Sequence, residues 1–209
     1  MQTLHPTRED FRALATPGAL VPVYKEVLAD LETPVTAYLR VASGASHSFL
    51  LESVEQAERL GQYTFIGANP SVVFKSKGRE VRITRDGTTE TFSHDSPMHA
   101  LRELMRGYQP VAVPGLPAFH GGAVGYIGYD QVRFFERLPD DNPDELNLPD
   151  LYFLITDTLL IFDHANNRIM LVSHVEVGDD ADAAYDAAVA KIDALTAKLD
   201  APLDVHAQA

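Results

Sequence analysis

The 209 residues are 45% hydrophobic and 22% charged, which is typical of a soluble globular protein with a sizeable core. The absence of cysteine excludes disulfides, thiol catalysis and thiolate metal sites, and it fits a reducing cytoplasm. A formal net charge of −13 disfavours nucleic acid and anionic membranes as partners, and no run of about 18 apolar residues predicts a transmembrane helix. We therefore expect a cytoplasmic protein that binds neither nucleic acid nor a membrane.

The first part of the chain contains signals for a short helix and an extended segment. Thr7 begins a capping-box pattern that opens the helix, and a Pro-Gly pair at residues 17–18 ends it. Residues 20–24 are predicted to be extended, with Pro22 keeping them at the edge of a sheet because proline cannot donate a ladder hydrogen bond. Residues 1–19 therefore read as a helical lead-in to the main domain.

A second helix and a series of short strands follow. Pro34 suits the first helical position of a segment within residues 30–42, where apolar residues recur at helical spacing. Residues 48–52 are continuous and apolar enough to predict a buried strand, and Asp86-Gly87 is a strong hairpin-turn signal. The other strands expected in this region are residues 63–67, 71–76, 80–84 and 88–92. Hairpin-linked strands of this length argue for an antiparallel sheet.

The middle of the chain predicts two helices around a glycine-rich strand. Ser96 followed by Pro97 is a capping signal for the first of these helices. After a proline-rich connector, residues 119–129 are glycine-dense and apolar, and they should form a central strand. Residues 130–136 then look like a short helix.

The C-terminal part should begin with an exposed loop at residues 138–150, which are rich in proline and acidic side chains. Residues 151–163 read as one long apolar strand, and a turn at residues 166–167 leads into its hairpin partner at 168–174. Residues 179–199 close the chain as a helix. Together these elements predict an α+β fold with a large, mainly antiparallel β-sheet and flanking helices.

Several motif-like patterns favour structural over catalytic roles. The glycine-rich stretch at residues 121–126 superficially suggests a phosphate loop, but it lacks the P-loop lysine and does not match G-x-G-x-x-G. Its glycines instead suit a place where a neighbouring strand approaches closely. The eight histidines are scattered without metal-site spacing. Asp150, Asp157 and Asp163 are conceivable as paired carboxylates, but Asp163 precedes a turn and suits turn formation better. We predict neither catalytic nor metal-binding residues.

The stretch Leu50-Leu51-Glu52-Ser53 is the strongest candidate for a binding site. A strand that ends and turns there would expose a carboxylate, a hydroxyl and free backbone groups at one point. A carboxylate can pair with the ammonium group of an amino acid, and backbone N–H groups can hold its carboxylate. Leu50 and Leu51 point to opposite faces of the strand and can supply an apolar wall. Taken alone, the same residues also fit a plain loop start.

Several motifs together resemble the anthranilate synthase component I family, and they match it in order and spacing from about residue 20 to residue 175. These motifs are Phe49-Leu50-Leu51-Glu52-Ser53, Glu58-Arg59, Tyr63-Thr64-Phe65-Ile66-Gly67, Asn69-Pro70, Gly121-Gly122-Ala123-Val124-Gly125-Tyr126, Tyr129-Asp130, Phe135-Glu136, Pro149-Asp150-Leu151, Asp157 and Phe162-Asp163-His164. Gln62 departs from the pattern, since a basic residue is expected there. That departure weakens any statement about charge beside the strand at residues 63–67.

The resemblance implies that residues 20–200 form the family's N-terminal regulatory domain and that residues 201–209 lead to a catalytic domain absent from this sequence. The family's whole enzyme makes anthranilate and pyruvate from chorismate and glutamine-derived ammonia, in tryptophan biosynthesis. Leu51, Glu52 and Ser53 would contact L-tryptophan as a feedback effector, with Ser53 the best single candidate. The partners implied are the catalytic chorismate-binding domain and a glutamine amidotransferase subunit.

By the same resemblance, the chain alone should be inactive and should hold no cofactor, because the Mg²⁺ of the family belongs to the catalytic domain. Three alternatives stay open. The chain can be the N-terminal domain of aminodeoxychorismate synthase component I, a sister family with the same fold, although the intact Leu-Leu-Glu-Ser favours the anthranilate branch. It can also be a purely structural docking module for the catalytic domain or the amidotransferase. An independent small enzyme built from scattered Asp and His residues is a third and weaker reading.

Overall fold

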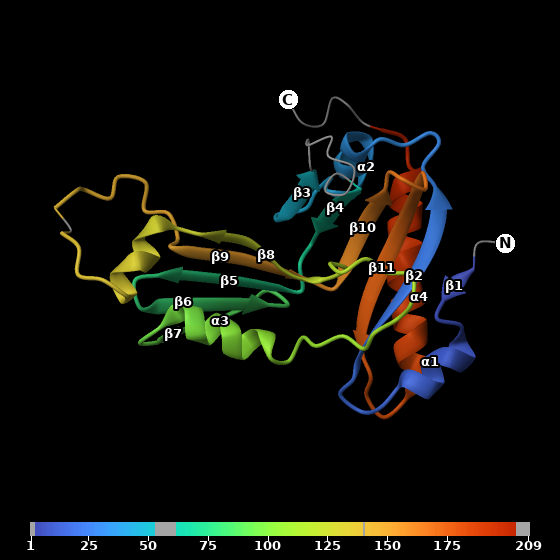
Figure 1. Ribbon diagram of the computed structural model, residues 1–209, viewed down its shortest axis with the longest axis horizontal. Coiled ribbons are helices and arrows are strands. Elements are labelled where there is room, and N and C mark those ends of the chain that lie inside the picture. Colours follow the sequence, from blue (N-terminus) through green and yellow to red (C-terminus); the bar gives the residue numbers. More distant parts are fainter. Residues whose placement is uncertain (1–2, 53–61, 140, 204–209) are drawn as a thin grey trace. The chain divides into compact units, whose positions relative to one another are not determined.

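The computed structural model describes residues 3–52, 62–139 and 141–203, and the chain forms two compact units (Figure 1). Unit 1 contains Met1–Pro70, Gln109–Gly121 and Thr156–Ala209, and unit 2 contains Ser71–Tyr108 and Gly122–Ile155. Each unit has its own sheet with helices. The predicted α+β class with antiparallel strands is confirmed, with the strands divided between two sheets.

Unit 1 is built on a six-stranded sheet with the order β1-β2-β11-β10-β4-β3. Its strands are β1 (Leu4–His5), β2 (Leu20–Leu28), β3 (Ser48–Glu52), β4 (Tyr63–Ala68), β10 (Thr158–Asp163) and β11 (Arg168–Glu176). β2 is longer than predicted. It is second in the order because the two-residue strand β1 pairs with it, at Lys25 and Tyr24. Pro22 lies outside that pairing and opposite His174 of β11, so its missing N–H is tolerated.

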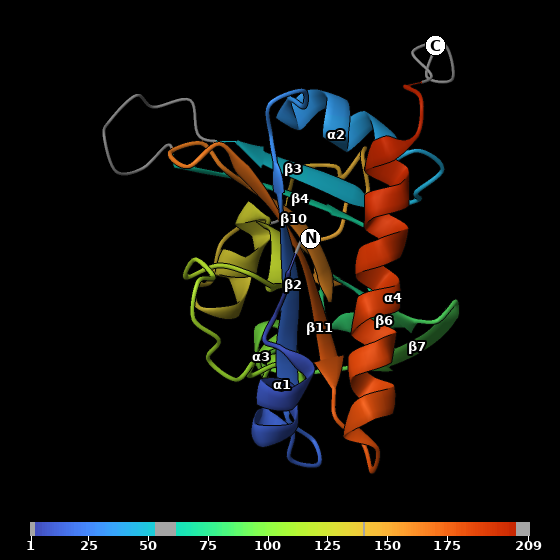
Figure 2. The same cartoon turned by 90° about the vertical axis from the view of Figure 1, so that its right-hand side faces the viewer.

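Three helices belong to unit 1, namely α1 (Arg8–Leu14), α2 (Pro34–Val41) and α4 (Ala181–Asp200). The predicted capping by Thr7 is confirmed, since its side chain accepts a hydrogen bond from the backbone N–H of Asp10 at 3.2 Å. Pro34 begins α2 as predicted. Figure 2 shows α4 lying along β2 and β11, with which it packs. No helix in the described part of the chain is long and apolar enough to cross a membrane.

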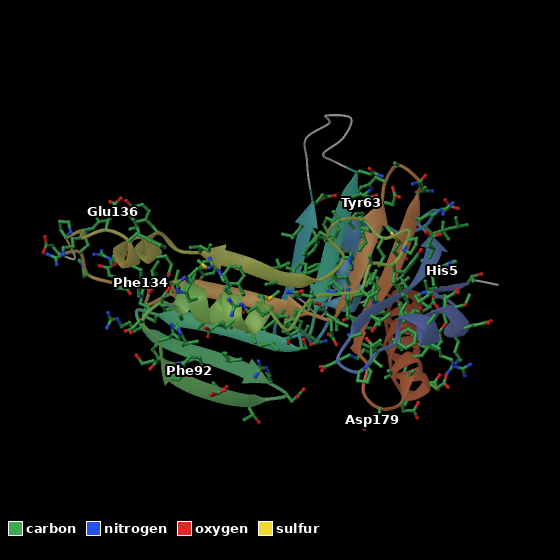
Figure 3. The ribbon with its side chains drawn as sticks, turned by 60° about the horizontal axis from the view of Figure 1, so that its bottom comes forward. His5, Tyr63, Phe92, Phe134, Glu136 and Asp179 are labelled. Atoms are coloured by element: carbon green, nitrogen blue, oxygen red, sulfur yellow. The ribbon has the colours of Figure 1, made fainter. Side chains whose placement is uncertain are left out.

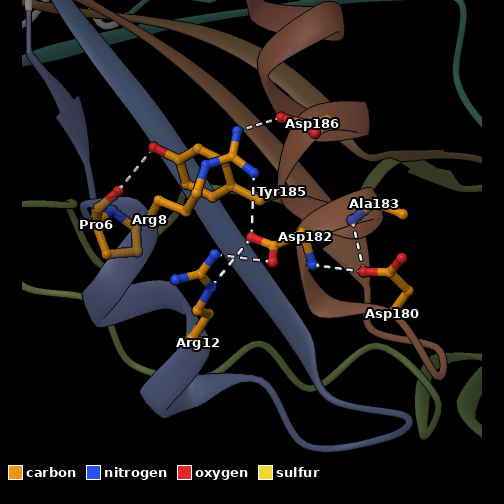
Figure 4. Close-up of polar contacts among 8 residues, drawn as sticks. All are labelled: Pro6, Arg8, Arg12, Asp180, Asp182, Ala183, Tyr185 and Asp186. Atoms are coloured by element: carbon orange, nitrogen blue, oxygen red, sulfur yellow. Dashed lines mark hydrogen bonds and ion pairs between the residues drawn. The ribbon is translucent and has the colours of Figure 1, made fainter.

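Helices α1 and α4 are joined by an ion-pair cluster and a ring contact (Figure 4). Arg8 binds both Asp182 and Asp186, and Arg12 binds Asp182 at 2.9 Å. The Arg8 guanidinium also lies 4.6 Å from the centroid of the Tyr185 ring. These hydrogen bonds raise the pKa of Arg8 and lower the pKa of Asp182. The pairs are exposed, so they orient the two helices more than they stabilise them.

The two faces of the unit 1 sheet carry separate hydrophobic clusters, as strand alternation requires. Ile169 and Leu171 of β11 belong to the cluster that includes buried residues of α1, α2 and α4. Met170 and Val172 belong to a second cluster on the opposite face. Buried apolar side chains on both faces explain why β10 and β11 read as nearly continuous apolar runs.

Unit 2 is built on a five-stranded sheet with the order β7-β6-β5-β9-β8. Its elements are β5 (Val72–Lys77), β6 (Glu80–Arg85), β7 (Thr88–Ser93), α3 (Pro97–Met105), β8 (Gly122–Ile127), the 3-10 helix η1 (Tyr129–Phe134) and β9 (Leu151–Thr156). Asp86 and Gly87 have φ values of 48° and 76°, so the predicted hairpin turn is confirmed. Ser96 precedes α3 as predicted, although its side chain makes no capping hydrogen bond.

Two strand predictions in this region were wrong. The apolar run at residues 151–163 does not form one strand, because Asp157 separates β9 in the unit 2 sheet from β10 in the unit 1 sheet. The glycine-rich strand β8 is last in its sheet rather than central. An apolar run indicates that a strand is buried but not which strand it pairs with. The sequence therefore predicted neither the break at Asp157 nor the position of β8 at the end of its sheet.

Candidate functional site

Strand β3, which ends in Leu51 and Glu52, is the last strand of the unit 1 sheet. Among the described residues it pairs only with β4, so one side of its backbone has no neighbouring strand. The prediction that residues 48–52 form a buried strand was therefore wrong. An edge strand has one open side, and Leu51 is 43% exposed. The predicted position at a strand end is confirmed, because β3 ends at Glu52.

The side chains of Leu51 and Glu52 lie on opposite faces of the sheet, as neighbours in a strand must. Leu51 lies opposite Phe65, which packs with the Met170 and Val172 cluster. Glu52 lies opposite Thr64, on the other face of the sheet. Leu50, two residues earlier on that face, packs against the hydrophobic cluster that includes residues of α1, α2 and α4. A ligand that contacts both Leu51 and Glu52 must therefore lie along the free edge of β3 or across its end. Ser53, the third predicted residue, lies outside the described residues.

Polar side chains surround the strand ends next to Glu52. Buried Thr64 has its hydroxyl 2.8 Å from Nε2 of His164. Gln62, where a basic residue is expected, donates from Nε2 to the hydroxyl of Tyr63 at 3.1 Å (Figure 3 labels Tyr63). Burial raises the pKa of Asp163, but hydrogen bonds from Asn166, Gln62 and Ala165 outweigh it and hold that pKa below its usual range.

The groups at the end of β3 can interact with the charged and apolar groups of an amino acid. The exposed carboxylate of Glu52 can pair with an ammonium group, and the free edge of β3 offers backbone N–H and C=O groups. Leu51 offers exposed apolar surface on the other face. Asp163 is a turn former, as predicted, because Oδ1 accepts from the N–H groups of Ala165 and Asn166 at 3.1 and 3.2 Å.

The glycine-rich stretch is structural, as the sequence favoured. A Cβ atom on Gly125 would overlap the carbonyl oxygen of Tyr152 and lie 2.7 Å from Cα of Phe153. Both of these residues belong to β9, which neighbours β8 in the sheet. Glycine is therefore needed for the close approach of the two backbones.

The sequence did not reveal a histidine pair in unit 1. Nδ1 of His120 lies 2.9 Å from Nε2 of His174, and their rings stack at 5.1 Å with an interplanar angle of 11°. His174 is 5% exposed, and its Nδ1 has no hydrogen-bond partner among the described residues. Burial, with a smaller contribution from His120, lowers the pKa of His174 to about 4. Only the fold brings these residues together, since 54 positions separate them.

The described residues contain no group of three or more His, Cys, Asp or Glu that could hold a metal ion. The Mg²⁺ expectation concerns a catalytic domain, and it stays a prediction. So do the effector roles of Leu51, Glu52 and Ser53 and the expected inactivity of the chain alone.

The family model described as chorismate binding enzyme matches residues 46–208, a stretch that includes β3 and both histidines of the pair. The chain belongs to the chorismate-binding enzyme family. Several of the proteins to which it is similar are named anthranilate synthase component 1. The protein of that name from Acetivibrio thermocellus is 35% identical over 188 residues, covering 90% of this chain and 38% of the relative. The one from Synechocystis is 37% identical over 211 residues, covering 99% and 41%.

A third such relative, from Pseudomonas aeruginosa, is 38% identical over 200 residues, covering 94% of this chain and 40% of the relative. The chain thus spans about two fifths of the length of the curated relatives that it matches. A crystal structure of anthranilate synthase component I from Streptococcus pneumoniae covers 84% of this chain and 37% of that chain, with a TM-score of 0.49 and 24% identity. That likeness is too distant to add to the argument.

Proposed function

We propose that this chain is the regulatory part of an anthranilate synthase component I and holds part of an L-tryptophan feedback site. In the proposed whole enzyme, chorismate and glutamine-derived ammonia give anthranilate and pyruvate, with a glutamine amidotransferase subunit as partner. Identity of 35–38% to relatives of that name over nearly the whole chain supports this proposal. The observation that carries it is the open end of β3, where Leu51 and Glu52 are exposed within the matched stretch.

The chemistry at β3 suits an amino acid with a large apolar side chain. Glu52 would pair with the ammonium group, backbone groups of the free edge would hold the carboxylate, and Leu51 would contact the indole ring. For feedback inhibition, tryptophan must bind one conformation of the enzyme more tightly than another. A ligand with equal affinity for both conformations does not change the equilibrium between them. We propose that the less active arrangement is the one with higher affinity.

Calorimetric titration of the purified chain with L-tryptophan tests the proposal. Glu52→Gln should weaken binding by about tenfold or more, because a charge-assisted hydrogen bond contributes about 1.5–3 kcal/mol. Leu51→Ala and Ser53→Ala should also weaken it. The matched controls are Glu176→Gln, at the exposed end of β11, and Leu31→Ala, at a 96% exposed position. Neither control should change the affinity.

A pocket that needs the catalytic domain would bind tryptophan only when that domain is added. In that case the same variants should weaken binding in the reconstituted enzyme. Absence of tryptophan binding in both settings would refute the effector proposal, and it would favour the aminodeoxychorismate branch or a structural role. Equal binding by the wild-type chain and by all three β3 variants would place the effector elsewhere.

A second function, docking of the catalytic domain or amidotransferase, is favoured by a different observation. Seven of the large hydrophobic residues that are exposed lie in one stretch of unit 2, between residues 126 and 148. They are Tyr126, Ile127, Tyr129, Phe135, Leu138, Leu146 and Leu148. Figure 3 shows this region around Phe134 and Glu136. Concentrated exposed apolar surface is typical of a protein interface.

The double variant Ile127→Ser with Phe135→Ser separates docking from effector binding. Both positions are more than half exposed, so the variant should fold normally. It should lose reconstitution of anthranilate synthesis with the remaining part of the enzyme while retaining tryptophan binding. Unchanged reconstitution at all protein concentrations would contradict the docking role.

A further inference from the structure

One face of the unit 2 sheet carries a hollow of about 270 Å³ whose lining includes three basic side chains. Lys75, Lys77 and Arg82 line it together with one carboxylate, that of Glu80. The strand register places Lys75 opposite Arg82 and Lys77 opposite Glu80, so these four side chains share one face of β5 and β6. The neighbouring positions in these strands, such as Phe74, contribute to the hydrophobic cluster on the other face.

The segment of the chain that contains β5 and β6 is less acidic than the protein as a whole. Residues 71–108 contain seven Lys and Arg against five Asp and Glu, a net charge of +2, in a chain with a net charge of −13. Within the hollow, Glu80 offsets the charge of Arg82, and Asp144 and Asp150 offset that of Lys77. Lys75 is therefore the side chain whose positive charge is left to attract an anion to this face.

Lys75 is the cation of this hollow that has no carboxylate partner among the described residues. Its Nζ lies 4.9 Å from the centroid of the Tyr152 ring, which leaves its hydrogen-bond donors available. Arg82, by contrast, donates from Nε to Glu80 at 2.7 Å, and Lys77 binds Asp144. Like charges that face each other across strands destabilise a sheet, so an anion between Lys75 and Arg82 would offset their repulsion.

The wall of the hollow is held in place by the loop that precedes β9. Nζ of Lys77 donates to the carbonyl oxygen of Leu148 at 2.9 Å, and Oδ2 of Asp150 accepts from the N–H of Gly78 at 2.7 Å. Asn147, which lines the hollow, has a left-handed φ of 47°, and its N–H donates to Oδ1 of Asp144 at 2.9 Å. The side-chain amide of Asn147 makes no hydrogen bond within the described residues, so it is a second available donor.

We propose that this hollow binds a small anion through a carboxylate or phosphate group. Nζ of Lys75 and the amide of Asn147 donate to the anion, and Arg82 contributes charge from the facing strand. The site uses none of the residues of β3, so it does not depend on the proposed tryptophan site.

The test is a ¹⁵N NMR titration of the chain with sodium phosphate and, separately, with sodium citrate, at constant ionic strength set by sodium chloride. Saturable shifts of the Lys75, Arg82 and Asn147 amide signals are expected. Lys75→Gln should weaken binding at least about fivefold, since it removes a charge-assisted hydrogen bond. Lys75→Arg, which retains the charge, should bind. The matched control is Arg85→Gln, which removes the same charge from β6 outside the hollow and should leave binding unchanged.

Saturation by phosphate alone or by citrate alone supports the site and identifies the class of anion. Shifts that rise linearly and equally in sodium chloride would overturn the proposal, as would equal affinity of the wild-type chain and Lys75→Gln. If Lys75→Gln loses the signal dispersion of a folded protein, Asn147→Ala supplies the same comparison.

Discussion

Unit 1 should lose stability in mild acid, because His174 is buried as a neutral imidazole. Burial and the nearby His120 lower its pKa from 6.5 to about 4. The backbone hydrogen bond to Asp157 and the charge of that residue raise the pKa by less than burial lowers it, and Lys191 has the smallest effect, a lowering. The unfolded chain therefore takes up a proton near pH 6.5, while the folded chain resists protonation until about pH 4.

The sign and size of the effect follow from this difference. The stabilisation is fully present above pH 6.5 and is lost as the pH falls toward 4, because the unfolded state binds the additional proton in that range. Since 1.36 kcal/mol corresponds to one pKa unit, the full loss is about 3 kcal/mol. Between pH 8 and pH 5, above the range in which most carboxylates protonate, the expected loss is about 2 kcal/mol.

Urea denaturation followed by circular dichroism between pH 5 and pH 8 measures this loss. His174→Gln should be less stable at neutral pH but should show a much flatter dependence on pH than the wild-type chain. His99→Gln removes an exposed histidine and should follow the wild-type curve. A parallel loss of stability in the wild-type chain and His174→Gln would refute the reasoning, because the acid-sensitive group would then lie elsewhere.

Three further substitutions test the packing and the turns in the same urea titration. Gly125→Ala should destabilise unit 2 by about 2 kcal/mol, because its Cβ overlaps β9, whereas Gly178→Ala, with no atom within 4 Å of the new Cβ, should have little effect. Phe11→Ala empties a fully buried position and should cost about 3–5 kcal/mol, against less than about 0.5 kcal/mol for Leu31→Ala. Asp163→Ala removes the acceptor of two backbone N–H groups and should cost about 1–2 kcal/mol. An effect of Gly178→Ala or Leu31→Ala equal to that of its partner would contradict the corresponding argument.

Features decided by neighbours in the chain were predictable from the sequence. Thr7 caps α1 because its hydroxyl reaches an N–H three residues on. Asp86 and Gly87 both adopt positive φ, which Asp tolerates better than most residues and which Gly adopts freely because it has no Cβ atom. These signals depend on a few adjacent residues, so one sequence is enough to identify them.

Features decided by distant partners were not predictable. The two sides of Asp157 are equally apolar, yet they pair with strands of different sheets. β3 looked buried because Leu50 and Leu51 are apolar, but only the strand order reveals its open edge. The same distinction holds for the functional residues. The strand end at Glu52 depends on local sequence and was predicted. The contact of His120 with His174 depends on long-range topology and was not.

Unit 1 is made of three separate segments of the chain, and this determines which unit can fold first during synthesis. Every segment of unit 2 has been made once Ile155 is added, whereas β10, β11 and α4 of unit 1 come later. β2 emerges early but pairs with β11, so its partner at Arg168–Glu176 is synthesised more than a hundred positions after it. A growing chain therefore has unit 2 ready to fold while the N-terminal strands still wait for their partners, the reverse of the usual N-terminal-first order.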